Sequence, residues 1–161
     1  MTQRTQAVEA FEAEYLEGFR QIYEEKIVFN QILGLKLIRI EPSGLVQARI
    51  DMRHDLVGHF AYNRIHGGVI SAALDAIGSA SVMAALAAKH MDEAPTKRLE
   101  RFAKLGTIDL RIDYLRPGIG DHFIIHAECL RVGSRVGTSR MEFRGPDGTL
   151  MSAGAAAYIV S

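Results

Sequence analysis

The sequence predicts one α+β domain in which a mainly antiparallel sheet of about six strands packs on a single long helix. Three observations support this prediction. The chain has 161 residues, which is enough for one domain and short for two. Residues 69–88 are almost all small and apolar, with a single charge at Asp75. On both sides of this run, polar and apolar residues alternate as they do in strands.

The N-terminal residues predict an amphipathic helix that braces the rest of the protein. Thr5 is a suitable N-cap, and apolar residues follow at helical spacing with glutamates between them: Val8, Phe11, Tyr15, Phe19 and Ile22. We assign residues 1–26 to a helical extension and residues 27–161 to the main domain. Within that domain, residues 27–33 predict a short helix that ends at Gly34.

The next segment predicts a β-hairpin followed by a loop. Residues 35–40 are apolar and rich in β-branched side chains, and residues 41–44 read Glu-Pro-Ser-Gly, which is typical of a turn. Residues 46–53 alternate strictly between apolar and polar side chains, as expected of a half-buried strand. Residues 54–65 show no periodicity, so we expect a loop there.

The helix that begins at Gly67 and ends near His90 is long and apolar enough to span a bilayer. Asp75 would be costly near the centre of such a span. A helix that is small and apolar on all sides is better explained as the core of a soluble protein, and we expect no membrane association. After it, residues 91–106 predict a polar connection with a basic run: Lys97, Arg98, Arg101 and Lys104.

The rest of the chain predicts four strands. Residues 108–114 alternate regularly and stop at the sequence Arg-Pro-Gly of residues 116–118. The other strands are residues 123–132, 135–144 and 149–160, separated by turns at 133–134 and 145–148. One sheet of this size covers only part of the long helix, so we expect a second molecule on the other side.

Composition limits the possible partners and compartments. Basic and acidic residues number 19 each, which argues against a large nucleic-acid surface. Cys129 is the single cysteine, and we interpret it as a core thiol in a reducing, cytoplasmic compartment. Residues 1–25 contain six glutamates and no apolar segment of the kind found in secretory signals. The six histidines lack metal-ligand spacing, so neither a metal nor another cofactor is expected.

The start of the long helix and Asp75 carry the chemistry. Gly67 and Gly68 allow close approach to backbone N–H groups that have no partner within the helix. These donors and the helix dipole suit a phosphate, a carboxylate or a polarised carbonyl oxygen. Asp75 lies eight residues after Gly67, about 12 Å along the axis, so one carbonyl group cannot contact both. If both act on one substrate, two antiparallel helices related by a two-fold axis must supply them.

Two segments of the chain resemble a known family of enzymes. The segment HGGVISAALD of residues 66–75 and the segment TIDLRIDYLRPG of residues 107–118 resemble the hotdog-fold acyl-CoA thioesterases of the PaaI-like branch. The resemblance covers about residues 27–160. It implies a curved antiparallel sheet around a central helix, a homodimer or homotetramer, and hydrolysis of acyl-CoA thioesters. Small residues along the helix favour medium or long fatty acyl chains, and hence a place in fatty acid metabolism.

The resemblance also implies roles for individual residues. The N–H of Gly67 would polarise the thioester carbonyl, and Asp75 of the partner chain would act as nucleophile or general base. His66 would shape the site, and Asn63 would position water or substrate, although it lies closer to His66 than in many relatives. A further polar residue of the helix is Ser79 or Ser81. The expected substrate-binding residues, whose arginines suit the phosphates of coenzyme A, are Gly68, His59, Thr107, Arg116, Arg131, Gly133, Ser134 and Arg135.

Two other functions stay open at this stage. Hydratases and dehydratases that act on acyl thioesters share the same fold, and His59-Phe60 and the pair Asp55/His59 superficially resemble their motifs. A hotdog domain can also bind an acyl-CoA without hydrolysing it. An assay for release of coenzyme A separates the hydrolase from the binding protein.

Overall fold

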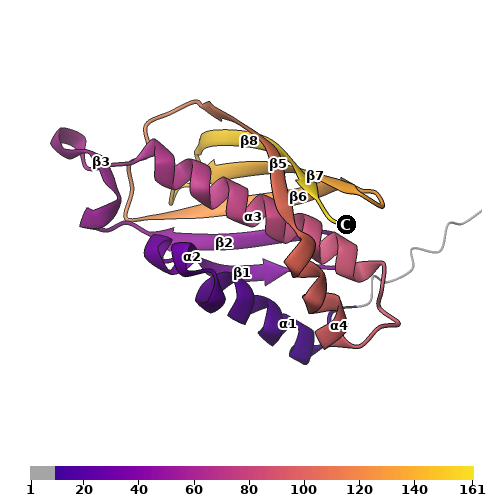
Figure 1. The fold of residues 1–161 in the computed structure, drawn as a ribbon. Coiled ribbons are helices and arrows are strands. Elements are labelled where there is room, and N and C mark those ends of the chain that lie inside the picture. The colour runs from indigo at the N-terminus through magenta and orange to yellow at the C-terminus, as the bar shows by residue number, and fades with distance from the viewer. Residues whose placement is uncertain (1–9) are drawn as a thin grey trace, which may run out of the picture.

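An antiparallel sheet of six strands forms the body of the computed structural model, which describes residues 10–161 (Figure 1). In spatial order the strands are β1 (Lys36–Ile40), β2 (Leu45–Asp51), β6 (His122–Val132), β7 (Val136–Arg144), β8 (Leu150–Ile159) and β5 (Gly106–Tyr114). The predicted strands are therefore confirmed. β1 and β5 form the two edges, so the strand that directly precedes β6 in the chain lies at the far side of the sheet.

The long helix α3 (Gly67–Ala88) lies across one face of this sheet (Figure 1). Its apolar residues pack on the inward side chains of the central strands, where the rings of Phe123 and Phe143 stack with centroids 5.0 Å apart. By length and composition alone α3 could cross a membrane, but 61% of that stretch is buried inside the fold. Burial of this kind contributes about 1.5–3 kcal/mol for each large apolar side chain.

One side of α3 is left uncovered by the chain's own sheet. The residues on this side are half-buried or exposed and recur at helical spacing: Gly68, Ser71, Ala72, Asp75, Ala76 and Ser79. Asp75 lies in the middle of this stripe and is half-buried, whereas the core helix predicted from the sequence would be covered on all sides. The difference arises because the sheet curves around only one part of the helix.

The N-terminal helices share the core of the sheet and α3. Helix α1 (Ala13–Arg20) continues into a π-helical segment, Gln21–Lys26, and is followed by α2 (Val28–Leu33). The predicted continuous α-helix therefore changes geometry at its C-terminal end. Its buried aromatic residues contact one another in a row that joins the core: Phe11, Tyr15, Phe19 and Tyr23. The predicted N-cap Thr5 and the predicted apolar residue Val8 lie outside the described residues.

Residues 54–65, predicted as a loop, contain a small hairpin. Strand β3 (Val57–His59) pairs with β4 (Arg64–Ile65), with 3-10 turns at His54–Leu56 and Phe60–Tyr62. These strands are too short to show an alternating pattern in the sequence. The hairpin projects beside the N-terminal end of α3 (Figure 1).

Residues 91–106, predicted as a polar connection, contain helix α4 (Pro95–Glu100) and a 3-10 segment, Arg101–Lys104. Arg98 belongs to the basic run but is fully buried. Its guanidinium donates to both carboxylate oxygens of Glu12, at 2.6 Å each, and lies 4.9 Å from the ring centroid of Tyr15. This contact between the buried Arg98 and the exposed Glu12 fastens α4 to the N-terminal helices.

Candidate active site

Asp75 is held in place from two neighbouring strands. Thr107 Oγ1 donates a hydrogen bond to Asp75 Oδ1 at 2.9 Å, and the hydroxyl of Tyr158 donates to the backbone carbonyl of Asp75 at 3.0 Å. Burial and the nearby carboxylate raise the pKa of Tyr158, so its hydroxyl stays protonated and remains a donor. Asp75 Oδ2 accepts no hydrogen bond from the described residues. A carboxylate with one oxygen fixed and the other unused can serve as a general base or nucleophile.

A β-bulge in β5 brings Thr107 to Asp75. Thr107 pairs with Tyr158 and Asp109 with Ala157, so Ile108 is an extra residue between two consecutive pairs. Strict alternation would place Thr107 on the opposite face from Leu110, which packs on the core. The extra residue reverses this, and Thr107 faces α3 beside its cross-strand partner.

An apolar pocket of about 220 Å³ opens beside Asp75. Its lining comes from α3, the N-terminal helices, the segment after α4 and the ends of β5 and β8. Ser79 lies one turn after Asp75 and lines the pocket; its hydroxyl donates to the carbonyl of Ala76 at 2.8 Å. Ser81, the alternative considered from the sequence, is buried and hydrogen-bonded to Ser139 instead.

The N-terminus of α3 keeps one backbone amide unused. His66 Nδ1 accepts a hydrogen bond from the N–H of Gly68 at 2.8 Å, so His66 caps the helix with its ring. In the neutral form its proton is therefore on Nε2. The N–H groups of Val69 and Ile70 bond to the carbonyl of His66 at 3.0 and 3.2 Å. The N–H of Gly67 has no partner among the described residues and is the donor left for a substrate oxygen.

The β3–β4 hairpin supports His66 and carries two other expected site residues. A Cβ atom at Gly58 would lie 2.6 Å from the Cα of His66, so the hairpin packs closely on the helix start because residue 58 is a glycine. His59 is exposed, with its ring centroid 5.0 Å from that of Tyr62. Asn63 is exposed and has a left-handed backbone, φ 48°, which favours asparagine at this turn. Its proposed role in positioning water stays a prediction.

Arg116 lies near Gly67. The two residues line a pocket of about 340 Å³ together with Arg64 and Tyr114. Arg116 Nη1 donates to the carbonyl of Leu150 at 3.0 Å, and the hydroxyl of Tyr114 donates to the carbonyl of Gly67 at 2.9 Å. Arg116 is thus separate from the other expected arginines, which line a different pocket.

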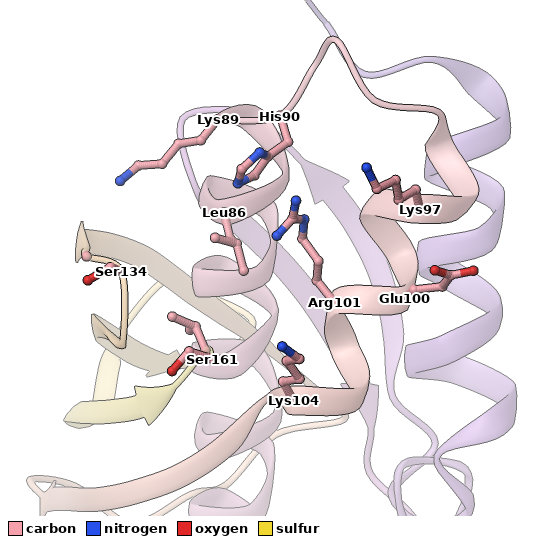
Figure 2. Close-up of a pocket in the computed structure, with 11 residues that line it drawn as sticks. Leu86, Lys89, His90, Lys97, Glu100, Arg101, Lys104, Ser134 and Ser161 are labelled. Carbon is pink, nitrogen blue, oxygen red and sulfur yellow. The ribbon is translucent and has the colours of Figure 1, made fainter.

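A larger basic pocket, of about 730 Å³, lies at the C-terminal end of α3. Figure 2 shows Arg101 and Lys104 pointing toward Leu86 and the chain end, whereas Glu100 points away from them. Other lining residues are Lys89, His90, Lys97, Gly133 and Ser134. A neighbouring pocket of about 280 Å³ shares Gly133 and Ser134 and adds Arg131 and Arg135. The structure therefore places these four expected residues beside the basic run.

Cys129 does not have the properties of a catalytic thiol. It is half-buried, and burial raises the pKa of the thiol. A raised pKa disfavours the thiolate that a nucleophile needs. The interpretation of Cys129 as a thiol that packs on the core is confirmed.

Gly67 and Asp75 of one chain cannot serve one carbonyl group. Eight residues of α3 separate them, about 12 Å along the axis. They also line different pockets. The free amide and the free carboxylate oxygen are therefore two separate half-sites of the candidate active site.

The fold is the one expected of a thioester hydrolase of the hotdog class, and the comparisons agree. The model of the thioesterase superfamily matches residues 62–152, more than half of the chain, including Gly67, Asp75 and Thr107. The chain belongs to the thioesterase superfamily. The resemblance seen in the sequence and the expected hotdog fold are thereby confirmed.

Several known proteins are similar to this chain. The medium/long-chain acyl-CoA thioesterase YigI of Salmonella typhimurium is 35% identical over 132 residues, which are 82% of this chain and 84% of the relative. YigI of Escherichia coli is 33% identical with the same coverage. A solved structure from Shewanella oneidensis, described as related to the thioesterase superfamily, has a TM-score of 0.84 and 32% identity, and the match covers 94% of this chain and 100% of that one.

Proposed function

We propose that the protein hydrolyses medium- or long-chain acyl-CoA thioesters to the free acid and coenzyme A. The observation that carries the proposal is the Asp75 carboxylate, which has one oxygen fixed by Thr107, the other unused, and an apolar pocket beside it. The names of the YigI relatives support the same substrate class. A role in fatty acid metabolism fits that substrate, and the single cysteine supports a cytoplasmic location.

In the proposed mechanism each active site uses two chains. The N–H of Gly67 donates to the thioester carbonyl oxygen and stabilises the negative charge that develops there, an effect of about 10²–10³ in rate for one such donor. Asp75 of the partner subunit takes a proton from the water that attacks the carbonyl carbon, or attacks that carbon itself to form a mixed anhydride that water then hydrolyses. In both routes the C–S bond breaks, and coenzyme A leaves as a thiolate that takes up the proton released by the water. The mechanism involves neither a metal nor a nucleotide cofactor.

The proposed assembly is a homodimer, or a homotetramer made of two dimers. Two features support it: β5 is an edge strand with unpaired backbone groups, and one side of α3 is uncovered. Helix α2 exposes three large apolar residues, Val28, Phe29 and Ile32. Two α3 helices packed antiparallel about a two-fold axis would place each Gly67 near the other chain's Asp75, which completes both half-sites.

The basic pocket at the end of α3 is the proposed site for the phosphates of coenzyme A. Leu86, which lines it, is eleven residues after Asp75, about 16 Å along the helix. Most of the charged side chains that line this pocket are cationic: they are Lys89, Lys97, Arg101 and Lys104, against Glu100. Glu93 pairs with Lys97 and Arg101, which hold the pKa of Glu93 below its usual range, whereas Lys104 forms no ion pair within the described residues.

The alternative of a hydratase or dehydratase lacks a supporting observation. His59 and Phe60, which resemble a dehydratase motif, lie on the exposed hairpin. Neither residue lines the pocket of Asp75 or the pocket of Gly67. Within one chain, the side chains needed for that chemistry are therefore not brought together with the helical acid.

A panel of acyl-CoA esters, varied in chain length and aromaticity and assayed with a thiol reagent, tests the proposed function. We expect release of coenzyme A above background, greatest for medium or long chains. Binding of an acyl-CoA without any release would instead indicate a sensor. Release restricted to short or aryl substrates would contradict the proposed chain length.

A further inference from the structure

The pocket beside Asp75 has two walls, of which one comes from outside the matched family region. The family model spans residues 62–152, yet Tyr23, Ile27 and Phe29 of the N-terminal helices form one wall of this pocket. Phe102 and Leu105, which follow α4, form a second wall. We propose that this double wall, with Phe102 as its adjustable part, sets the length of the acyl chain that the enzyme accepts. This inference rests on the proposed function.

Tyr23 forms a rigid end to the pocket. It is 1% exposed, its ring stacks on Phe19 with centroids 4.8 Å apart, and it meets Phe102 edge-on at 5.6 Å. Its hydroxyl lies 3.2 Å from Ser79 Oγ. Because the proton of Ser79 is directed at the carbonyl of Ala76, the hydroxyl of Tyr23 is the donor in this pair. Tyr23 is therefore fixed to α3 one turn beyond the catalytic carboxylate.

The π-helical turn strengthens this anchor. In an α-helix the N–H of Ile27 would bond to the carbonyl of Tyr23, but here it bonds to the carbonyl of Ile22 at 3.0 Å. The carbonyl of Tyr23 accepts instead from Nδ2 of the buried Asn30, at 2.9 Å. The backbone and the side chain of Tyr23 are thus both held, so the wall cannot easily move back to admit a longer chain.

The size of the pocket matches a limited chain length. Its volume of about 220 Å³ is below the range of ~300–1,000 Å³ that is usual for ligand pockets. Ser79 is four residues after Asp75, so the end wall begins about 6 Å along the helix from the reacting carboxylate. A medium-length chain that extends from the thioester therefore reaches Tyr23 and Phe102, and a longer chain fits only where Phe102 gives way.

Phe102 is the residue whose size should change the accepted length. Its ring is half-buried and contacts Tyr23. Phe102 takes no part in the hydrogen bonds that fix Tyr23 to Ser79 and Asn30, so its size can be changed without breaking them. Phe102→Ala opens the wall and Phe102→Trp fills the pocket further. Each additional buried methylene should raise kcat/KM about fourfold, until the enlarged pocket is full.

The experiment compares saturated acyl-CoA esters from butyryl to palmitoyl in the wild type, Phe102→Ala and Phe102→Trp. We expect the optimum to move to longer chains in Phe102→Ala and to shorter chains in Phe102→Trp. Phe11→Ala is the matched control, because Phe11 lies at the other end of the aromatic row that Phe102 contacts through Tyr23 and does not line the pocket. Its profile should keep the wild-type shape. If Phe102→Ala melts too low to assay, Phe102→Leu makes the same test with a smaller expected shift.

A second readout separates this inference from the proposed function. Free fatty acids from butyrate to palmitate are added to each variant, and the melting temperature is measured without any turnover. A profile of stabilisation against chain length that shifts in Phe102→Ala supports the inference even if no acyl-CoA is hydrolysed. Identical profile shapes in the wild type and both Phe102 variants, by turnover and by melting, would overturn it. A shift of equal size in Phe11→Ala would overturn it too, since loosening alone would then be the cause.

Discussion

Thr107→Val removes the hydroxyl that orients Asp75 and keeps the shape of the side chain. A hydrogen bond to a charged group contributes about 1.5–3 kcal/mol. Thr107 is exposed in the single chain, so the lower end of this range applies. Since about 1.4 kcal/mol in the barrier is a factor of ten in rate, we expect kcat to fall about tenfold. KM should change little, because the contact positions the carboxylate and does not itself bind the ground-state substrate.

The assay is steady-state release of coenzyme A from one acyl-CoA that the wild type turns over well. Thr107→Ser is the matched control: it restores the donor at the same position, so its kcat should return to near the wild-type value. Thermal unfolding of all three proteins checks that the fold is intact. A Thr107→Val enzyme with the wild-type kcat, or an equal loss in Thr107→Ser, would refute the assigned role of the hydroxyl.

Three further predictions concern other parts of the site and its support. Asp75→Asn should lower the rate by about 10²–10⁴-fold with an unchanged melting temperature, and wild-type turnover would exclude the proposed chemistry. Lys104→Glu should raise KM about tenfold at low salt and less at high salt, with no rise for an acyl-pantetheine substrate; an equal rise for both would contradict a phosphate contact. Glu12→Gln should lower the melting temperature at neutral pH, because the buried charge of Arg98 loses its charged partner. Arg98 holds the pKa of Glu12 below its usual value, so this stabilisation is present above the ordinary pKa and is lost as the pH falls through the lowered one. Melting curves across acidic pH should therefore show the two proteins converging, and a constant gap would count against the ion pair.

The sheet and α3 could be predicted because their patterns are local. Residues 108–114 alternate with period two, and residues 69–88 are too uniformly apolar for a surface helix. Asp75 stands out within that helix because a charged side chain in an apolar segment costs free energy unless it is paired or hydrogen-bonded. These signals require no knowledge of what the segment contacts, and the structure confirms the elements they predict.

The supporting contacts of the site could not be predicted in the same way. The bulge at Ile108 reverses the direction of Thr107, and an alternating pattern contains no sign of it. Arg98 looks like any member of a basic run, since its partner Glu12 lies 86 residues away. The apolar pattern that predicts the N-terminal helix contains Ile22 rather than Tyr23, and the place of Tyr23 at the pocket depends on where that helix meets α3. In each case the missing information is a contact distant in sequence.

The shared active site is tested most directly by mixing two inactive variants under conditions that exchange subunits. One carries Asp75→Asn. The other carries Gly67→Val. A Cβ at this position would lie 3.4 Å from the Tyr114 ring, so the two further methyl groups of valine would crowd the start of the helix. Each heterodimer then holds one site with both residues intact and one with both changed. We predict that activity returns to at most half the wild-type value per heterodimer. A mixture that stays inactive although mass spectrometry shows heterodimers would contradict a site built from two chains.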